Sequence, residues 1–237
     1  CTGLQMIKLP KNYKIIKANT FDSCSKLGRI ELPESIEIIE SSAFAKSGLK
    51  NIIIPVNVKR IDQQAFQSSK LESITIKDAT VVIGNRAFES CENLSQVELG
   101  KKTESIEHSA FKNCGKLEYI NIPDSVTSMN ASIFESCDSL KEIKLGTGIT
   151  VIPQKMCYEC GSLEKIVLPY GIATIKMQAF ANCAKLSEIT IPRNTATITD
   201  DVFSYPSKMT IYGVSGTYAE KYAGEQGIKF VSIDNKA

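Results

Sequence analysis

The amino-acid sequence predicts a right-handed, β-rich solenoid of about nine coils, each 22 or 23 residues long, with a C-terminal α/β cap. Two recurrences carry this prediction, because a fixed period of this length is typical of stacked-repeat proteins. The first is a leucine phase: Leu4, Leu27, Leu49, Leu71, Leu94, Leu117, Leu140, Leu163 and Leu186. The second is an aromatic phase, in which Cys157 takes the place of one phenylalanine: Phe21, Phe44, Phe66, Phe88, Phe111, Phe134, Phe180 and Phe203.

The first element of each coil is a strand that follows the phase leucine. Aliphatic residues stand three and five positions after each leucine, as Ile120 and Ile122 do after Leu117. This alternation places the aliphatic side chains on one side of an extended chain and the residues between them on the other. Pro, Gly or Lys then ends the strand.

The second element is a shorter extended stretch, as in Ser125–Met129, followed by a turn or a single helical turn that begins with a small residue and the phase phenylalanine. One such unit cannot bury its apolar face alone, so the stacked coils must share one continuous core. We therefore expect phase residues such as Leu71 and Leu117 to be buried.

The C-terminal segment departs from the repeat. After Phe203 only Met209, Tyr212 and Val214 remain in phase. Tyr218, Ala219, Tyr222 and Ala223 then share one helical face. Gly224 and Gly227 are expected to end this helix, and an extended segment, 228–233, follows. We predict one domain, with the solenoid over residues 1–214 and its cap over residues 215–237.

The repeat unit, Leu-x-x-Ile-x-Ile/Leu-Pro followed by Ile and then Ala-Phe-x-x-Cys, resembles the BspA-like (treponemal-type) leucine-rich repeats over roughly residues 1–214. Such repeats are found largely in bacterial surface proteins. The resemblance implies a leucine-rich-repeat solenoid, an extracellular or cell-surface location in bacteria, and a role in adhesion or contact with host proteins. Two repeats, Phe44 to Phe66 and Phe66 to Phe88, are one residue short and lack the cysteine.

Seven of the eight cysteines stand three residues before a phase leucine and form a ladder along one interior line. They are Cys1, Cys24, Cys91, Cys114, Cys137, Cys160 and Cys183. We interpret them as reduced thiols that pack as small buried hydrophobes. Three alternatives stay open: disulfides between neighbouring coils, for which parallel side chains are awkwardly placed; a redox or zinc half-site at Cys157-x-x-Cys160; and a lipid on Cys1.

Charge and hydropathy exclude other classes of partner. Lys and Arg number 28 and Asp and Glu 26, a near-balance that argues against a nucleic-acid partner. Apolar runs such as Asn51–Val56 are far shorter than the ~20 residues of a membrane span, so we expect no direct membrane insertion. The sequence itself contains no signal peptide, which says nothing about where the native protein resides. We interpret the chain as a mature or trimmed form, the alternative being an open N-terminal coil covered by another segment. The oligomeric state stays open.

Residues suited to catalysis are sparse. The single histidine, His108, lies in a turn before Phe111, where a solvated role is the simplest interpretation. The sequence contains no glycine-rich phosphate loop. We predict no enzymatic activity, no cofactor and no metal.

The outward side chains of the leading strands vary from coil to coil, whereas the inward ones do not. We predict a protein-binding or adhesion face there, for partners that include host or extracellular-matrix proteins. The candidate residues are Arg29, Glu31, Asn51, Ile53, Gln96, Glu98, Tyr119, Asn121, Glu142, Lys144, Lys165 and Val167. Two alternatives stay open. This face is only a solvated sheet surface, or the protein is a structural spacer or scaffold that presents other domains and has no ligand of its own.

Overall fold

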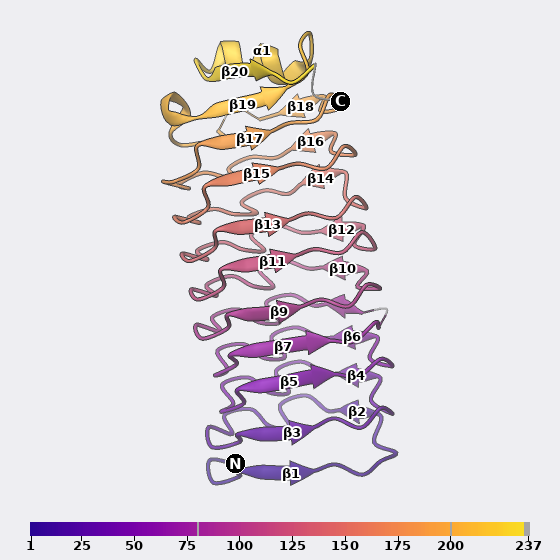
Figure 1. Cartoon of the computed structure of the whole chain (residues 1–237). Coiled ribbons are helices and arrows are strands. Elements are labelled where there is room, and N and C mark those ends of the chain that lie inside the picture. Colours follow the sequence, from indigo (N-terminus) through magenta and orange to yellow (C-terminus); the bar gives the residue numbers. More distant parts are fainter. Residues whose placement is uncertain (80, 200, 235–237) are drawn as a thin grey trace.

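The chain forms an elongated right-handed solenoid with its two termini at opposite ends (Figure 1). The computed structural model describes residues 1–79, 81–199 and 201–234, so the last three residues of the predicted cap lie outside the described residues. Within these ranges nine coils carry a front and a back strand, and a tenth turn begins with one more front strand. The predicted fold class is confirmed, with about ten turns in place of nine.

The front strands follow the phase leucines and face the viewer in Figure 1. They are β1 (Met6–Lys8), β3 (Arg29–Glu31), β5 (Asn51–Ile54), β7 (Ser73–Ile76), β9 (Gln96–Glu98), β11 (Tyr119–Asn121), β13 (Glu142–Lys144), β15 (Lys165–Val167), β17 (Glu188–Thr190) and β19 (Thr210–Gly213). Where they pair they are parallel, and Ile7 lies opposite Ile30 as the repeat predicts. The alternation is observed directly: Ile120 is fully buried, while its neighbours Tyr119 and Asn121 are exposed.

The back strands are shorter, with two residues each. They are β2 (Ile15–Ile16), β4 (Ile38–Ile39), β6 (Arg60–Ile61), β8 (Val82–Ile83), β10 (Ser105–Ile106), β12 (Ser128–Met129), β14 (Val151–Ile152), β16 (Thr174–Ile175) and β18 (Thr197–Ile198). Their second residues face the core, which front and back strands enclose together. Leu71 and Leu117 lie in that core with no exposed surface, so the predicted burial is confirmed.

The turn around each phase phenylalanine is irregular rather than helical. In eight coils, the residue two positions before the phase phenylalanine (or Cys157) and the residue two positions after it are both non-glycine residues with φ between 53° and 62°. The left-handed backbone at these residues orients every second amide N–H group toward the next coil. The Phe21 and Ser23 N–H groups, for example, donate to the carbonyls of Ala43 and Ala45. These positions hold Ser, Asn, Gln, Lys, Arg and Glu, and none holds a β-branched residue, which tolerates positive φ least. The turns thus add a third line of hydrogen bonds between coils.

The phase phenylalanines form a stack along the interior. From Phe21 to Phe134 successive ring centroids lie 5.1–5.8 Å apart. The stack is interrupted at Cys157, and the position before it, alanine in most coils, holds the fully buried Met156. A long, flexible methionine fills irregular gaps well, so Met156 offsets much of the volume that the missing ring would occupy.

η1 (Pro206–Lys208) precedes β19, and the C-terminal cap contains α1 (Tyr218–Glu225) and β20 (Lys229–Ser232), which pairs in parallel with β19. Two details of the sequence interpretation were wrong. The register places Ile211, not Tyr212, opposite Ile189, because one residue is missing from this coil. Gly224 lies inside α1, and Gly227, with φ +65°, ends the helix as its amide bonds the Gly224 carbonyl. The boundary at residues 214–215 stays a prediction.

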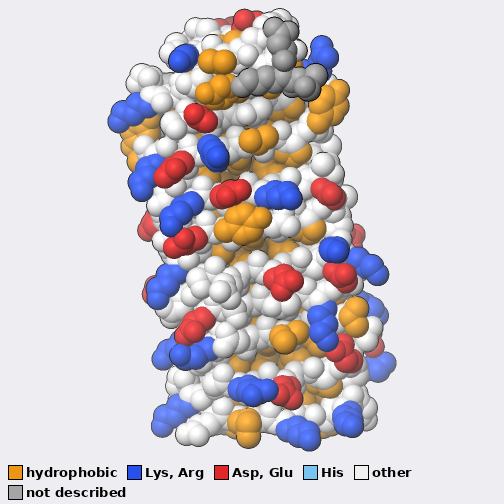
Figure 2. Space-filling view, viewed as in Figure 1, with side chains coloured by type: hydrophobic (Ala, Val, Ile, Leu, Met, Phe, Trp, Pro, Cys, Tyr) orange, Lys and Arg blue, Asp and Glu red, His pale blue; other side chains and the backbone are white. Residues whose placement is uncertain are grey.

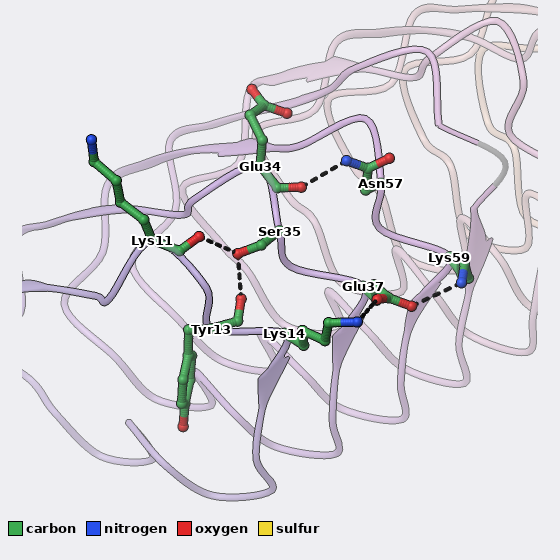
Figure 3. A network of polar contacts seen from close by, with 8 residues as sticks. All are labelled: Lys11, Tyr13, Lys14, Glu34, Ser35, Glu37, Asn57 and Lys59. Atoms are coloured by element: carbon green, nitrogen blue, oxygen red, sulfur yellow. Dashed lines mark hydrogen bonds and ion pairs between the residues drawn. The ribbon is translucent and has the colours of Figure 1, made fainter.

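Side chains on one flank join the first coils (Figure 3). The Ser35 hydroxyl lies 2.7 Å from the carbonyl oxygens of both Lys11 and Tyr13 in the preceding coil. Glu37 bridges Lys14 and Lys59 from the coils on either side, and these two ammonium groups, Lys59 foremost, hold the pKa of the Glu37 carboxyl below its usual value. Because these ion pairs are exposed, they contribute little to stability.

Candidate protein-binding face

The strand face, defined as the outward side chains of β3 to β15, contains all twelve candidate residues, and every one of them is exposed. Figure 2 shows positive and negative side chains interspersed on this side of the molecule, with hydrophobic side chains between them. The most exposed apolar side chains among the candidates are Val167, at 63%, and Ile53, at 58%, and the Tyr119 side chain is 47% exposed. The candidates therefore lie together on one continuous side of the solenoid.

The strand face is divided by three seams. Among the described residues the front strands form four separate sheets: β1-β3, β5-β7-β9, β11-β13 and β15-β17-β19-β20. Neighbouring strands on the two sides of a seam remain adjacent in space but form no strand pairing. The seams thus lie between β3 and β5, β9 and β11, and β13 and β15.

A hollow opens at each seam. The one at β3 and β5 has a volume of about 650 Å³ and is lined by Arg29, Glu31, Ile53 and their neighbours. The one at β9 and β11 measures about 350 Å³, with Gln96 and Tyr119 among its walls. The one at β13 and β15 measures about 320 Å³. Two further hollows lie at the edge of the face, where the strands β7 to β13 end.

The polar groups of the strand face are paired at its N-terminal end. Arg29 forms an ion pair with Glu31, and the Ser73 hydroxyl donates a hydrogen bond of 2.7 Å to the Asn51 side chain. At the edge of the first hollow Lys77 pairs with Glu34, which lies two coils earlier. Sequence reasoning missed this last pair, because only the stacking geometry brings these two residues together.

The C-terminal half of the strand face is different. In the part of the chain that the structure describes, the side chains of Glu142, Lys144 and Lys165 make no hydrogen bond or ion pair, although they surround the third hollow. Charged side chains that are not engaged in a hydrogen bond or ion pair are available to a binding partner. The apolar side chain of Val167 lies beside them in the same hollow.

Six of the ladder cysteines and Cys157 lie in the interior. Cys24, Cys91, Cys114, Cys137, Cys157, Cys160 and Cys183 are all buried free thiols. Several donate to a carbonyl of the preceding coil, as Cys137 does to Phe111 at 3.1 Å. Burial raises the pKa of the Cys91 thiol to about 11 and also raises those of Cys157 and Cys160, which disfavours the nucleophilic thiolate.

Two parts of the ladder differ from the sequence interpretation. Cys1 is exposed at the end of the solenoid rather than interior. The two coils without cysteine have buried serines, Ser47 and Ser69, in its place. These coils lack one residue between the serine and the phase leucine. Counting back from the leucine therefore did not show that Ser47 and Ser69 occupy the cysteine position. The Ser47 hydroxyl has no hydrogen-bond partner, whereas the Ser69 hydroxyl lies 3.4 Å from the Cys91 sulfur.

Thiol reactivity tests this arrangement. A small alkylating reagent is expected to modify only Cys1 rapidly in the folded protein, and all eight cysteines after unfolding. The physical reason is that the other seven thiols are shielded by the core. Mass spectrometry before and after denaturation counts the modified groups. A final count below eight would indicate existing disulfides and contradict the structure.

Among the described residues there is no group of three or more His, Cys, Asp or Glu side chains placed to hold a metal ion. His108 is half-buried, and none of the five hollows above is lined by it. No described helix combines the length and the apolar character needed to cross a membrane.

Comparison with known proteins gives a consistent result. Residues 1–114 and 81–210 match the model of the BspA type leucine-rich repeat region, in six copies. No curated protein matches the sequence significantly. The T. pallidum leucine-rich repeat protein TpLRR is 22% identical over 82% of this chain and 89% of its own, with a TM-score of 0.62.

Two further solved structures share the fold. A leucine-rich cell surface protein of Faecalibacterium prausnitzii is 22% identical, with a TM-score of 0.51 over 93% of this chain and 81% of its own. The pneumococcal vaccine antigen PcpA is 16% identical, with a TM-score of 0.50 over 96% of this chain and 89% of its own. At these identities the likeness establishes the fold alone.

Proposed function

The chain belongs to the BspA-type leucine-rich repeat family, and from this membership we propose that it is a non-catalytic protein-binding or adhesion module of a bacterial cell-surface or secreted protein. Its partner, a host or extracellular-matrix protein, docks on the strand face. Leucine-rich repeat solenoids typically have no enzymatic activity, and their extended sheets offer broad surfaces for macromolecules. The cell-surface description of the F. prausnitzii protein supports the location.

The observation that carries this proposal is a difference between the two sides of each front strand: the inward residues are nearly uniform from coil to coil, and the outward residues vary. Core packing constrains the inward residues and places no demand on the outward ones. The outward residues nevertheless combine exposed apolar side chains, unpaired charges and three seam hollows on one side of the molecule. Apolar anchors that fill pockets, surrounded by polar groups, are the usual composition of a protein interface.

The third hollow is the part of this face best suited to docking. Its lining is mostly apolar, from Ile143, Leu145, Ile166 and Pro169, and Val167 projects beside it. Lys144, Lys165 and Glu142 surround this apolar area with charges that make no hydrogen bond or ion pair among the described residues. A partner with a projecting apolar side chain flanked by charges of both signs would be complementary to it. Because the charges are mixed in sign, we expect only a modest salt dependence of binding.

The test compares two matched double variants in a binding screen against immobilised extracellular-matrix and plasma proteins. Lys144→Glu with Val167→Asp changes the strand face, and Lys176→Glu with Met177→Asp makes the same two chemical changes at residues just after the back strand β16. We expect the wild type and the Lys176→Glu, Met177→Asp variant to bind the same immobilised protein with equal affinity. The strand-face variant should bind it about tenfold or more weakly, as expected when an anchor and its charge are lost.

Each other outcome has a definite meaning. Equal binding by both variants would move the site away from this face. Binding by none of the proteins, including the wild type, would contradict the docking role and favour the alternative of a structural spacer that presents other domains.

A further inference from the structure

The hollow between β9 and β11 has a different chemistry from the rest of the strand face. It is lined by Ser73, Ile74, Thr75, Ser95, Gln96, Val97, Glu98 and Tyr119. No lysine or arginine contributes to it, and Glu98 is its single charged group. It is a shallow, open depression of the strand face with a volume of about 350 Å³.

The floor of this hollow contains Val97. In the other front strands from β3 to β17 the middle aliphatic position holds a buried isoleucine, such as Ile74 or Ile120. Val97 has one methylene less, lies beside the seam where strand pairing stops, and remains half-buried. An apolar floor is therefore accessible from the solvent at this one internal position of the phase.

The walls offer an aromatic ring and free hydrogen-bonding groups. Tyr119 is 47% exposed. The side chains of Gln96, Glu98 and Tyr119 make no hydrogen bond or ion pair within the described structure, whereas Ser95 and Ser73 bond to Glu72 and Asn51. An exposed amide supplies donors and an acceptor, a carboxylate accepts, and the tyrosine hydroxyl does both.

This combination matches the surface of a sugar ring, and we propose that the hollow between β9 and β11 binds a neutral carbohydrate. A pyranose has a face of C–H groups, which suits Tyr119 and Val97, and an edge of hydroxyl groups, which suits Gln96 and Glu98. Tyrosine is amphipathic in the same sense, with an apolar body and a polar tip. The absence of cations in the lining disfavours phosphorylated or sulfated ligands, which require charge-assisted hydrogen bonds.

The sugar site does not depend on the proposed docking of a protein. The docking test changes residues at β13 and β15, and the sugar site uses β9 and β11. Either site can therefore fail in an experiment without affecting the result at the other.

The experiment titrates the whole chain with neutral oligosaccharides by calorimetry and saturation-transfer NMR, after an array of β-glucan, chitin-type, galactan and N-acetyllactosamine chains has selected the best binder. The informative variant is Gln96→Leu, which keeps an outward side chain of similar size in the lining and removes its hydrogen-bonding amide. We expect it to fold as stably as the wild type and to lose binding. Tyr119→Ala should weaken binding about tenfold by removing the ring contact.

Tyr170→Ala is the matched control, because Tyr170 is 67% exposed and lies outside the hollow. It should leave the affinity unchanged, and thermal melting should show that all variants fold. If no oligosaccharide of the array binds at millimolar concentration, the proposal is overturned. It is equally overturned if Gln96→Leu and Tyr119→Ala bind as well as the wild type. A protein partner lost in Tyr119→Ala, without any sugar binding, would instead assign the hollow to protein docking.

Discussion

Replacing Phe88 by alanine is expected to lower the free energy of unfolding by about 3–5 kcal/mol, as truncation of a buried core aromatic typically does. The Phe88 ring has no exposed surface and is stacked between Phe66 and Phe111, with centroids 5.2 Å away on both sides. The cavity left behind would adjoin both neighbouring rings. Phe134→Ala should cost less, because Phe134 stacks on Phe111 alone and has Cys157 on its other side. Chemical denaturation of both variants measures this difference.

The damage should also be local. In a solenoid each coil contacts only its neighbours, so the loss of Phe88 should loosen the adjacent coils most. Hydrogen exchange is therefore expected to accelerate around Phe66 and Phe111 and to change little near Phe203. A uniform increase along all coils would show that the array unfolds as one cooperative unit. A free energy of unfolding unchanged by Phe88→Ala would contradict the stacked core itself.

Replacing Gly100 by alanine is expected to destabilise the protein by about 1–3 kcal/mol, the usual cost of overpacking. A Cβ atom there would lie 2.1 Å from the Lys77 carbonyl oxygen and 2.9 Å from that of Ile76, both in the preceding coil. These are backbone atoms, so they cannot rotate away as the end of a side chain would. Relief of the contact requires the two coils to move apart next to the seam between β9 and β11.

Gly115→Ala is the matched control for Gly100→Ala. A Cβ at Gly115 would have no heavy atom within 4 Å outside its chain neighbours, so the substitution should be neutral or slightly stabilising. The midpoint of denaturant unfolding compares the two variants. Similar losses in both would show that backbone entropy, rather than the approach of the coils, determines the effect.

The sequence alone determined the core of this protein. Leu71, Leu117 and Ile120 are buried as their phases predict, because each coil repeats the same packing requirement. The same logic placed the candidate residues of the strand face on one exposed side. A helix after Tyr218 was also predictable from its apolar face, since Ala219 and Tyr222 are buried against the last coil.

Other features were determined by the tertiary structure. The buried serines Ser47 and Ser69 occupy cysteine positions that a one-residue shortening concealed in the sequence. The ion pair between Lys77 and Glu34 spans two coils. Residues with positive φ flank each phase phenylalanine, and hydrogen bonds to the next coil hold this backbone conformation. The residue types at these positions vary, so the sequence does not identify them.

The seams illustrate the reason most clearly. Val97 is visible in the sequence as one more aliphatic residue in its phase, yet only the stacked coils show that strand pairing stops between β9 and β11. The phase pattern records which side of the chain is apolar, and this information is local and repeated in each coil. Whether two neighbouring front strands pair is a property of coils that are already stacked, and the phase pattern is the same on both sides of a seam. This pairing exists only after the coils have packed, and it divides the strand face into separate sheets.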